Sequence, residues 1–223
     1  MKKSVILLVV LALAACVAGI SVAADSSAAA PAAATGFKRF NVYTDRTARD
    51  NHFMPSGWMG DYGDIKLDTG WKDNPHSGAT CIKIVYTAEQ KQGAGWAGIF
   101  WQNPANNWGT KPGGYDLTGA KKLTFWARGE KGGEMLSKTQ VGTLAEVKVG
   151  GITGEYADSD SVSIGPITLT PEWKEYTIDL TGKDLSYISG GFCWGQALPI
   201  TRAGSRSTLT IFITSRRELF CLV

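Results

Sequence analysis

Glycine, proline, asparagine and aspartate interrupt this sequence at short intervals from residue 37 onward. The chain has 27 Gly in 223 residues, and turn-forming pairs such as Asn74-Pro75 and Thr181-Gly182 separate its apolar runs. Glycine and proline are both unfavourable inside helices, so the elements between these breaks are short. The spacing therefore predicts short strands joined by turns, with little helix.

The runs between the turns have the composition of β-strands. Cys81–Tyr86 and residues 123–128 alternate with a period of two and contain β-branched and aromatic residues. The predicted strands are residues 37–43, 64–68, 81–87, 96–101, 122–128, 145–152, 161–169, 173–180, 190–194 and 208–214. About ten short strands in one domain predict an all-β fold, an antiparallel β-sandwich or jelly roll.

The N-terminal residues form a separate segment. Lys2 and Lys3 precede a short apolar run, which is the pattern of a secretory signal peptide, here residues 1–23. Two processing sites fit it. Residues 13–16 resemble the lipobox of bacterial lipoproteins, in which Cys16 is lipidated, and residues 21–25 fit ordinary signal-peptidase cleavage.

Residues 24–36 consist of Ala, Ser and Pro with few other types, and this composition predicts a linker that buries no core. Both processing routes predict an exported protein, outside the cytoplasm in the periplasm, on the outer surface or in the medium. A lipid on Cys16 is the one membrane contact that we expect.

The charge distribution argues against a nucleic-acid partner. The formal net charge is +3, but residues 37–201 hold 17 basic and 18 acidic side chains. A protein that binds nucleic acid needs a basic face to displace counterions, and this body has no basic surplus from which to build one.

The sequence also carries no catalytic motif. A glycosidase needs two carboxylates that face each other, and the acids at Glu130, Glu134, Asp158 and Asp160 lie in turns, where we expect them to be solvated. Two His and no Gly-x-Ser-x-Gly, P-loop, dinucleotide or Cys-x-x-Cys motif point away from nucleophilic, nucleotide and zinc chemistry. We therefore expect no enzymatic activity, with a jelly-roll glycosidase or lyase as the alternative.

Tryptophan and asparagine are concentrated between residues 95 and 109. Strand alternation places two sets of side chains on opposite faces, Trp96, Gly98 and Phe100 on one and Ala97, Ile99 and Trp101 on the other. We expect one set to join the core and the other to line the surface. Aromatic rings stack on the C–H faces of sugars, and amides hydrogen-bond hydroxyls, so the mixture predicts a neutral, polyhydroxylated ligand. The alternative is that these tryptophans only fill the core.

A second candidate segment, residues 51–64, contains a Pro and several Gly and is predicted to be a loop, either functional or an Ω-loop packed on the sandwich. The predicted carbohydrate-binding residues of both segments are Trp58, Tyr62, Trp96, Trp101, Asn103, Asn107 and Trp108.

Cys81 and Cys193 lie in different predicted strands. In an exported protein they form either a disulfide or two buried thiols, and both alternatives predict that both side chains are buried.

Five stretches of this sequence resemble carbohydrate-binding modules of the galactose-binding jelly-roll type. They are PSGWMGD (55–61), WAGIFWQNPANNWG (96–109), DLTGAKKLTFWARGE (116–130), VGGI (149–152) and WKEYTIDLTGKDLS (173–186). The resemblance covers about residues 37–200. It implies a noncatalytic domain that binds a polysaccharide or cell-surface glycan, often with a structural Ca²⁺, whose ligands the motifs do not identify. The alternative from another class is a structural or adhesive surface lipoprotein without a glycan ligand.

The chain departs from these domains in two places. Residues 135–144 add length, and residues 215–223 lack the acidic pair that normally closes the last strand. Because the first and last strands of a jelly roll usually pair, we expect residues 208–214 to be a strand of the domain 37–214. We expect the atypical tail, residues 215–223, to add little.

Overall fold

The computed structural model describes residues 37–132, 135–136, 147–197, 209–214 and 221–222, all within one compact unit, Gly36–Val223. The predicted signal peptide, Cys16 and the linker lie outside the described residues, as does most of the insertion at 135–144. Among the residues described, no helix combines the length and the apolar character needed to cross a bilayer.

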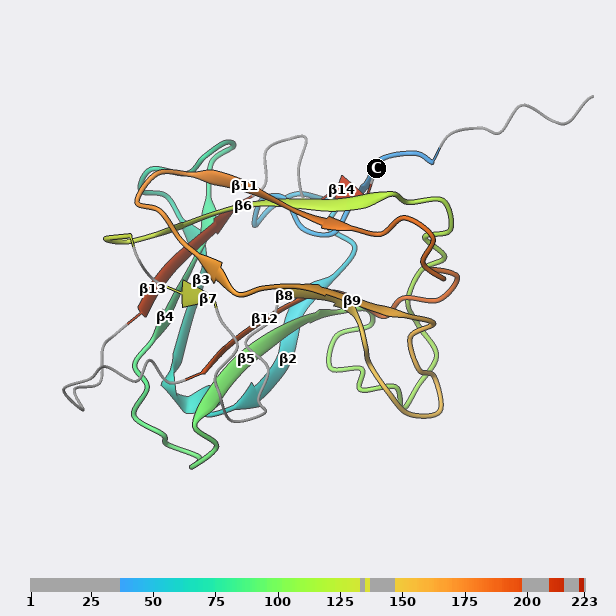
Figure 1. The fold of residues 1–223 in the computed structure, drawn as a ribbon, viewed down its shortest axis with the longest axis horizontal. Coiled ribbons are helices and arrows are strands. Elements are labelled where there is room, and N and C mark those ends of the chain that lie inside the picture. Colours follow the sequence, from blue (N-terminus) through green and yellow to red (C-terminus); the bar gives the residue numbers. More distant parts are fainter. Residues whose placement is uncertain (1–36, 133–134, 137–146, 198–208, 215–220, 223) are drawn as a thin grey trace, which may run out of the picture. The chain divides into compact units, whose positions relative to one another are not determined.

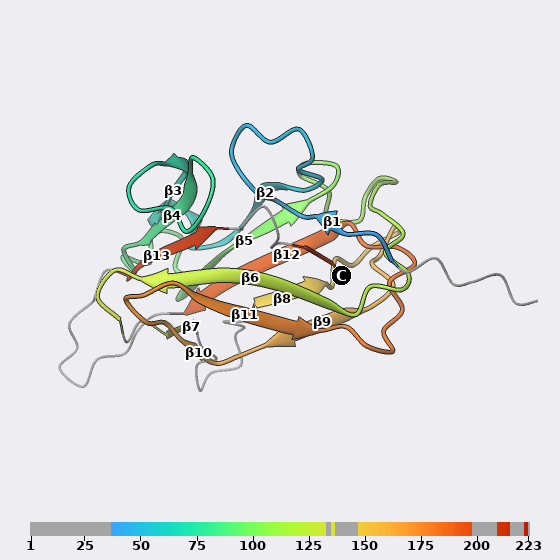
Figure 2. The same cartoon turned by 90° about the horizontal axis from the view of Figure 1, so that it is seen from above.

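The described chain folds as an antiparallel β-sandwich, which confirms the predicted fold class (Figures 1 and 2). One sheet has seven strands: β1 (Phe40–Asn41), β3 (Ile65–Trp71), β4 (Cys81–Tyr86), β6 (Lys122–Gly129), β11 (Lys174–Asp179), β13 (Leu209–Thr214) and β14 (Cys221–Leu222). The other has five: β2 (Met54–Gly60), β5 (Trp96–Gln102), β8 (Val147–Gly150), β9 (Ser161–Ile164) and β12 (Gly190–Ala197). A 3₁₀ turn, η1 (Tyr62–Asp64), follows β2, and β7 (Met135–Leu136) pairs with β10 (Ile167–Thr168).

The order of strands in the five-stranded sheet is β2-β5-β12-β8-β9. In the other sheet β6 is central: β11 runs along one of its edges, and β13 and β14 share the other. Figure 1 shows β6 and β11 in the layer above β12, β5 and β2.

Aromatic rings link the two sheets through the core. The ring of Phe192 in β12 lies 5.1 Å from Trp101 in β5 and 5.4 Å from Phe125 in β6, in edge-to-face arrangements. Phe125 in turn stacks on Tyr176 of β11 at 5.4 Å. Such pairs add to the free energy gained by burying their area, so this row helps to hold one sheet against the other.

The alternation predicted for residues 96–101 is confirmed for the set that joins the core, but the other set does not line the surface, because Gly98 and Phe100 are also buried. Ala97, Ile99 and Trp101 belong to the core between the sheets, whereas Phe100 belongs to a second, smaller buried cluster. The paired strand β12 follows the same alternation, because Phe192 and Trp194 lie opposite core residues of β5.

The prediction of a loop over residues 51–64 is wrong for Met54–Gly60, which forms β2 and pairs with β5. Pro55 and Gly57, which are both unfavourable in strands, led to the prediction of a loop. Pro55 is tolerated because β2 pairs on one side and so lies at the edge of the sheet. Gly57 follows a register shift, and a Cβ there would come within 2.8 Å of the Gln102 side chain.

The C-terminal strand is confirmed over Leu209–Thr214, where β13 pairs with β4 and β6. The prediction that residues 215–223 add little to stability stays a prediction, but Cys221–Leu222 is part of the sheet. This pair forms β14, between β6 and β1, so the first and last strands of the domain do pair. A two-residue strand shows no alternation, which is why the sequence pattern missed it.

Cys81 and Cys193 lie in different sheets and are both buried thiols, which confirms the predicted burial. Burial is the main reason why the pKa of Cys81 is raised to about 11. A thiol with such a pKa holds almost no thiolate at neutral pH, and the thiolate is the reactive form.

We therefore expect both cysteines to resist alkylation. Iodoacetamide at neutral pH should leave Cys81 and Cys193 unlabelled in the native protein and label both in urea, as read by peptide mass mapping. Labelling of either residue within minutes under native conditions, or a Cys81–Cys193 disulfide in a nonreducing map, would contradict the structure.

Candidate functional site

The face of the five-stranded sheet that points away from the core, called the outer face below, carries a row of neighbouring residues. Phe100 in β5 lies opposite Cys193 in β12, Cys193 lies opposite Lys148 in β8, and Lys148 lies opposite Ser163 in β9. Directly opposite residues share a face of the sheet. The row therefore crosses four strands on the outer face.

A small apolar cluster lies beneath this face. Phe100 and Cys193 are buried together with Ile152 from the loop after β8, and Met59 of β2 packs against them. Because the other side of these strands is also buried in the main core, β5 and β12 are covered on both faces. The cover on the outer side comes from loops as well as strands.

Glycines of β5 and β12 allow close packing over the outer face. Gly98 in β5 and Gly195 in β12 lie opposite each other. A Cβ on Gly98 would come within 2.7 Å of the Trp194 carbonyl oxygen, and one on Gly190 within 2.5 Å of the Phe100 ring. Larger side chains are excluded at these two positions, because Met59 already packs over Gly98 and Phe100 and Ile152 pack over Gly190.

Trp108 stands over this face on the loop that follows β5. Its ring meets Phe100 edge to face, with centroids 6.3 Å apart and an interplanar angle of 89°. The side chain is nevertheless 39% exposed. An indole that is held on one side and open on the other is a surface on which a flat apolar ligand face can stack.

Internal hydrogen bonds fix the loop that carries Trp108. The Gln102 amide donates to the Asn107 carbonyl oxygen at 2.8 Å, and the Asn107 amide donates to the Lys111 carbonyl oxygen at 2.9 Å. The Ser56 hydroxyl of β2 accepts the backbone N–H of Asn106 at 2.9 Å. The loop is therefore tied to both β5 and β2.

Two of the predicted binding residues reach the outer face. Trp108 is exposed there, and Trp96 lies on the same side of β5 as Phe100 and is half-buried. Trp58 is 40% exposed, but it lies opposite the core residue Ile99, so it belongs to the opposite side of the sheet at its edge. Tyr62 is 52% exposed and lies in η1, beyond the end of β2.

Three predicted residues are instead used inside the protein. Trp101 is fully buried in the core, and Asn107 is fully buried beneath the loop that it braces. Asn103 donates to the carbonyl oxygen of His52 and to the Tyr115 hydroxyl, at 2.9 and 2.6 Å. The amides that the sequence analysis assigned to sugar hydroxyls therefore already have protein partners.

Met59 and Lys148 also belong to this face, although neither was predicted as a binding residue. Met59 lay in the segment predicted to be a loop, so its side was undefined. Lys148 is one polar residue in a short alternating run, and only the pairing of β8 with β12 places it beside Cys193 and Phe100. No local signal in the sequence indicates that pairing.

The buried carboxylate of Asp61 holds the loop before β5. It accepts the backbone N–H groups of Gln92, Ala94 and Gly95 at 2.9, 2.9 and 2.6 Å. A carboxylate with three such donors has a structural role, because the loop loses its anchor if the side chain turns away.

Asp158 plays the same part beside the outer face. Its oxygens accept the N–H of Ile152 at 3.0 Å, and both the N–H and the hydroxyl of Ser189, at 2.6 and 2.7 Å. The carboxylate thus joins the loop after β8 to the start of β12.

These carboxylates do not fit the structural Ca²⁺ that the sequence resemblance implies. Ca²⁺ takes about six to eight oxygen ligands, and its positive charge would repel the N–H donors that face Asp61 and Asp158. Within the described part of the chain, no three His, Cys, Asp or Glu side chains gather in a way that would hold a metal ion.

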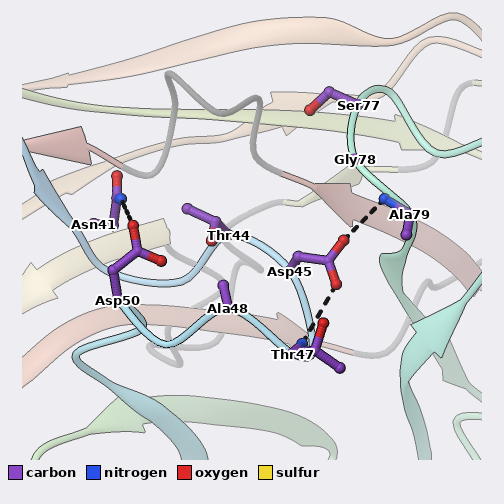
Figure 3. Close-up of a pocket in the computed structure, with 9 residues that line it drawn as sticks. All are labelled: Asn41, Thr44, Asp45, Thr47, Ala48, Asp50, Ser77, Gly78 and Ala79. Atoms are coloured by element: carbon purple, nitrogen blue, oxygen red, sulfur yellow. Dashed lines mark hydrogen bonds between the residues drawn. The ribbon is translucent and has the colours of Figure 1, made fainter.

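A separate polar cavity of about 480 Å³ lies between the loop after β1 and the loop before β4 (Figure 3). Asp45 joins the two loops by accepting the N–H groups of Thr47 on one side and of Ala79 and Thr80 on the other. Nine residues line the cavity and none is aromatic: Asn41, Thr44, Asp45, Thr47, Ala48, Asp50, Ser77, Gly78 and Ala79. It therefore lacks a surface for stacking.

No protein-family model matches the sequence, and the comparison with curated proteins finds no match. Among solved structures the chain is similar to a family 30 carbohydrate-binding module, with 14% identity over 79% of this chain and 95% of that chain and a TM-score of 0.48. It is similar to the family 30 module of a cellulosomal cellulase of Clostridium thermocellum, with 14% identity, coverages of 79% and 94%, and a TM-score of 0.46. It is also similar to a family 29 module variant complexed with mannohexaose, with 11% identity, coverages of 79% and 87%, and a TM-score of 0.42.

The positions of the two tryptophans predict unequal losses of stability from the same substitution. Trp101→Ala should lower the free energy of unfolding by about 3–5 kcal/mol, because it empties a fully buried site. Trp108→Ala should lower it by about 1 kcal/mol or less. Urea unfolding followed by tryptophan fluorescence measures both, and equal losses would contradict the placement of either residue.

Asp45 predicts a dependence of stability on pH. Burial favours a higher pKa, but the N–H donors of Ala79, Thr47 and Thr80, with the Thr80 hydroxyl, outweigh it and hold the pKa below the ordinary value of 3.8. A lowered pKa in the folded state adds stability above about pH 4 and loses it as the pH falls through the folded-state pKa. Asp45→Asn should therefore be less stable than wild type at neutral pH, and the gap should narrow below about pH 4. A gap that stays constant in thermal melts from neutral to acid pH would refute this.

Proposed function

We propose that this protein binds a polysaccharide or cell-surface glycan, without catalysis, on the outer face of the five-stranded sheet. The observation that carries the proposal is the exposed indole of Trp108, fixed by its loop and packed edge to face on Phe100 at the outer face. Trp96 and Met59 extend the same surface along β5 and β2.

The geometry suits a sugar chain better than a single sugar. Trp96 and Phe100 are four residues apart along β5, a distance of about 13 Å. Because Trp108 packs on Phe100, the two indoles lie at separate positions along the strand. Stacking removes apolar C–H faces and indole surface from water together, and a ring already held in place loses little conformational entropy on binding. The hydroxyls at the edge of each sugar stay in contact with water.

The absence of catalysis is part of the proposal. Asp158, the carboxylate braced beside this face, has its oxygens turned to backbone and hydroxyl donors, which leaves it poorly placed to exchange protons with a substrate. If the protein is instead a glycosidase or lyase, it will degrade a member of a polysaccharide panel and lose that activity when one acid is replaced.

We further propose that the protein acts outside the cytoplasm, on the basis of the signal-peptide pattern in residues 1–23, with a lipid on Cys16 as its one membrane attachment. A surface protein without a glycan ligand is the remaining alternative. It predicts no binding on a broad glycan array.

The test compares two equally exposed tryptophans on opposite sides of the sheet. Trp108→Ala should weaken glycan binding by about 1–3 kcal/mol, the range measured for one aromatic stacked on a nucleobase. Trp58→Ala, the matched control, should leave binding unchanged. Affinity electrophoresis of the protein against a panel of soluble polysaccharides measures both, and melting temperatures show that both variants fold.

Loss of binding with Trp58→Ala alone would move the site to the edge of the sheet at β2. Failure of the wild-type protein to bind any polysaccharide of the panel would overturn the proposed function.

A further inference from the structure

Lys148 is the cation of the outer face. It lies in β8 between Cys193 and Ser163, and its Nζ sits 5.2 Å from the centroid of the Phe100 ring. The side chain is half-buried, so its aliphatic stem covers apolar surface while the ammonium group stays at the edge of the cluster. Trp108 meets the same Phe100 ring at 6.3 Å, so the ammonium and the exposed indole share one neighbour.

Two carboxylates in the loop between β8 and β9 have other partners. Asp158 accepts donors from Ile152, Ser189 and Gly190. Asp160 pairs with Lys183 at 3.6 Å and accepts the Ser161 N–H at 2.7 Å. Within the described residues, Lys148 makes no ion pair with a carboxylate; its recorded contact is the one with the Phe100 ring.

A half-buried ammonium group beside a stacking surface selects for negative charge. Contact with a ring stabilises a cation less than a carboxylate or sulfate within hydrogen-bonding distance does, because a charge-assisted hydrogen bond adds to the Coulomb attraction. Partial burial also lowers the local dielectric, which strengthens that attraction. A neutral sugar hydroxyl offers the ammonium a weaker partner.

We infer that the glycan bound by this face is acidic, and that Lys148 contacts a carboxylate or sulfate of a sugar next to the one stacked on Trp108. This inference rests on the proposed function and names its substrate class. It revises the neutral ligand predicted from the sequence. The amides of Asn103 and Asn107, on which that prediction depended, bind groups within the protein, whereas Lys148 places a positive charge on the outer face.

Ligand pairs with the same backbone and different charge test the inference. One pair is cellohexaose and its C6-oxidised counterpart, in which each ring carries a carboxylate. The other is oligogalacturonate with its carboxyl groups methyl-esterified or free. Calorimetric titration of the wild-type protein should show tighter binding of the acidic member of at least one pair. The preference should shrink from 0.02 M to about 1 M NaCl, where the Debye length falls to roughly 3 Å.

Substitution of Lys148 separates charge from packing. Lys148→Met keeps the stem over Phe100 and should weaken binding of the acidic member about tenfold while leaving the neutral member unchanged. Lys148→Arg should retain the preference. Lys66→Met removes an exposed lysine of β3 in the other sheet and should change neither.

The outcomes distinguish the two proposals. Equal binding of neutral and acidic members, or an equal effect of Lys148→Met on both, overturns the acidic specificity and leaves the glycan-binding function in place. Failure of both pairs and of every polysaccharide in the wider panel to bind the wild-type protein overturns the function and this inference with it.

Discussion

Burial of strands β5 and β12 on both faces is the constraint on which the rest of this domain depends. One face of each strand contributes to the core between the sheets, through Trp101 and Phe192, and the other contributes Phe100 and Cys193 to a second cluster. Strands alone cover only the first face. The second requires loops folded back over it, so the loops of this domain are packed elements, and the positions of their polar side chains follow from that requirement.

Polar side chains of these loops act mainly as braces. Asn107 and Asp61 are buried and bind backbone groups, which offsets their loss of hydration, and the half-buried Asp158 does the same. The bonds of Gln102, Asn107 and Ser56 fix the loop that carries Trp108. A binding surface of this kind is prepared before the ligand arrives, because the entropy of ordering the loop is lost during folding and not during binding.

Sequence patterns predicted the parts of the fold that depend on local alternation. Period-two runs located most strands and divided residues 96–101 into two sets, but they did not show which set would face the core or that Phe100 of the other set would also be buried. Alternation does not reveal which strands will be neighbours, so the contact between Lys148 and Phe100 could not be predicted from the sequence. Nor does residue type distinguish a bracing amide from a binding one, which is why Asn107 was assigned to the ligand. Trp101 and Trp108 are chemically identical, and only the three-dimensional packing separates a core ring from an exposed one.

Strand β2 has a further consequence for the behaviour of the protein in solution. A free sheet edge with a regular row of N–H and C=O groups invites pairing with a second chain and thus aggregation. Here Pro55 has no N–H to donate, and the register shift between Pro55 and Gly57 breaks the regular row. Pro55 and Gly57, which made this strand look like a loop in the sequence, thus also make its edge a poor partner for a strand of another copy. The sheet can therefore expose Trp58 and Met54 at this edge without pairing with a neighbouring chain.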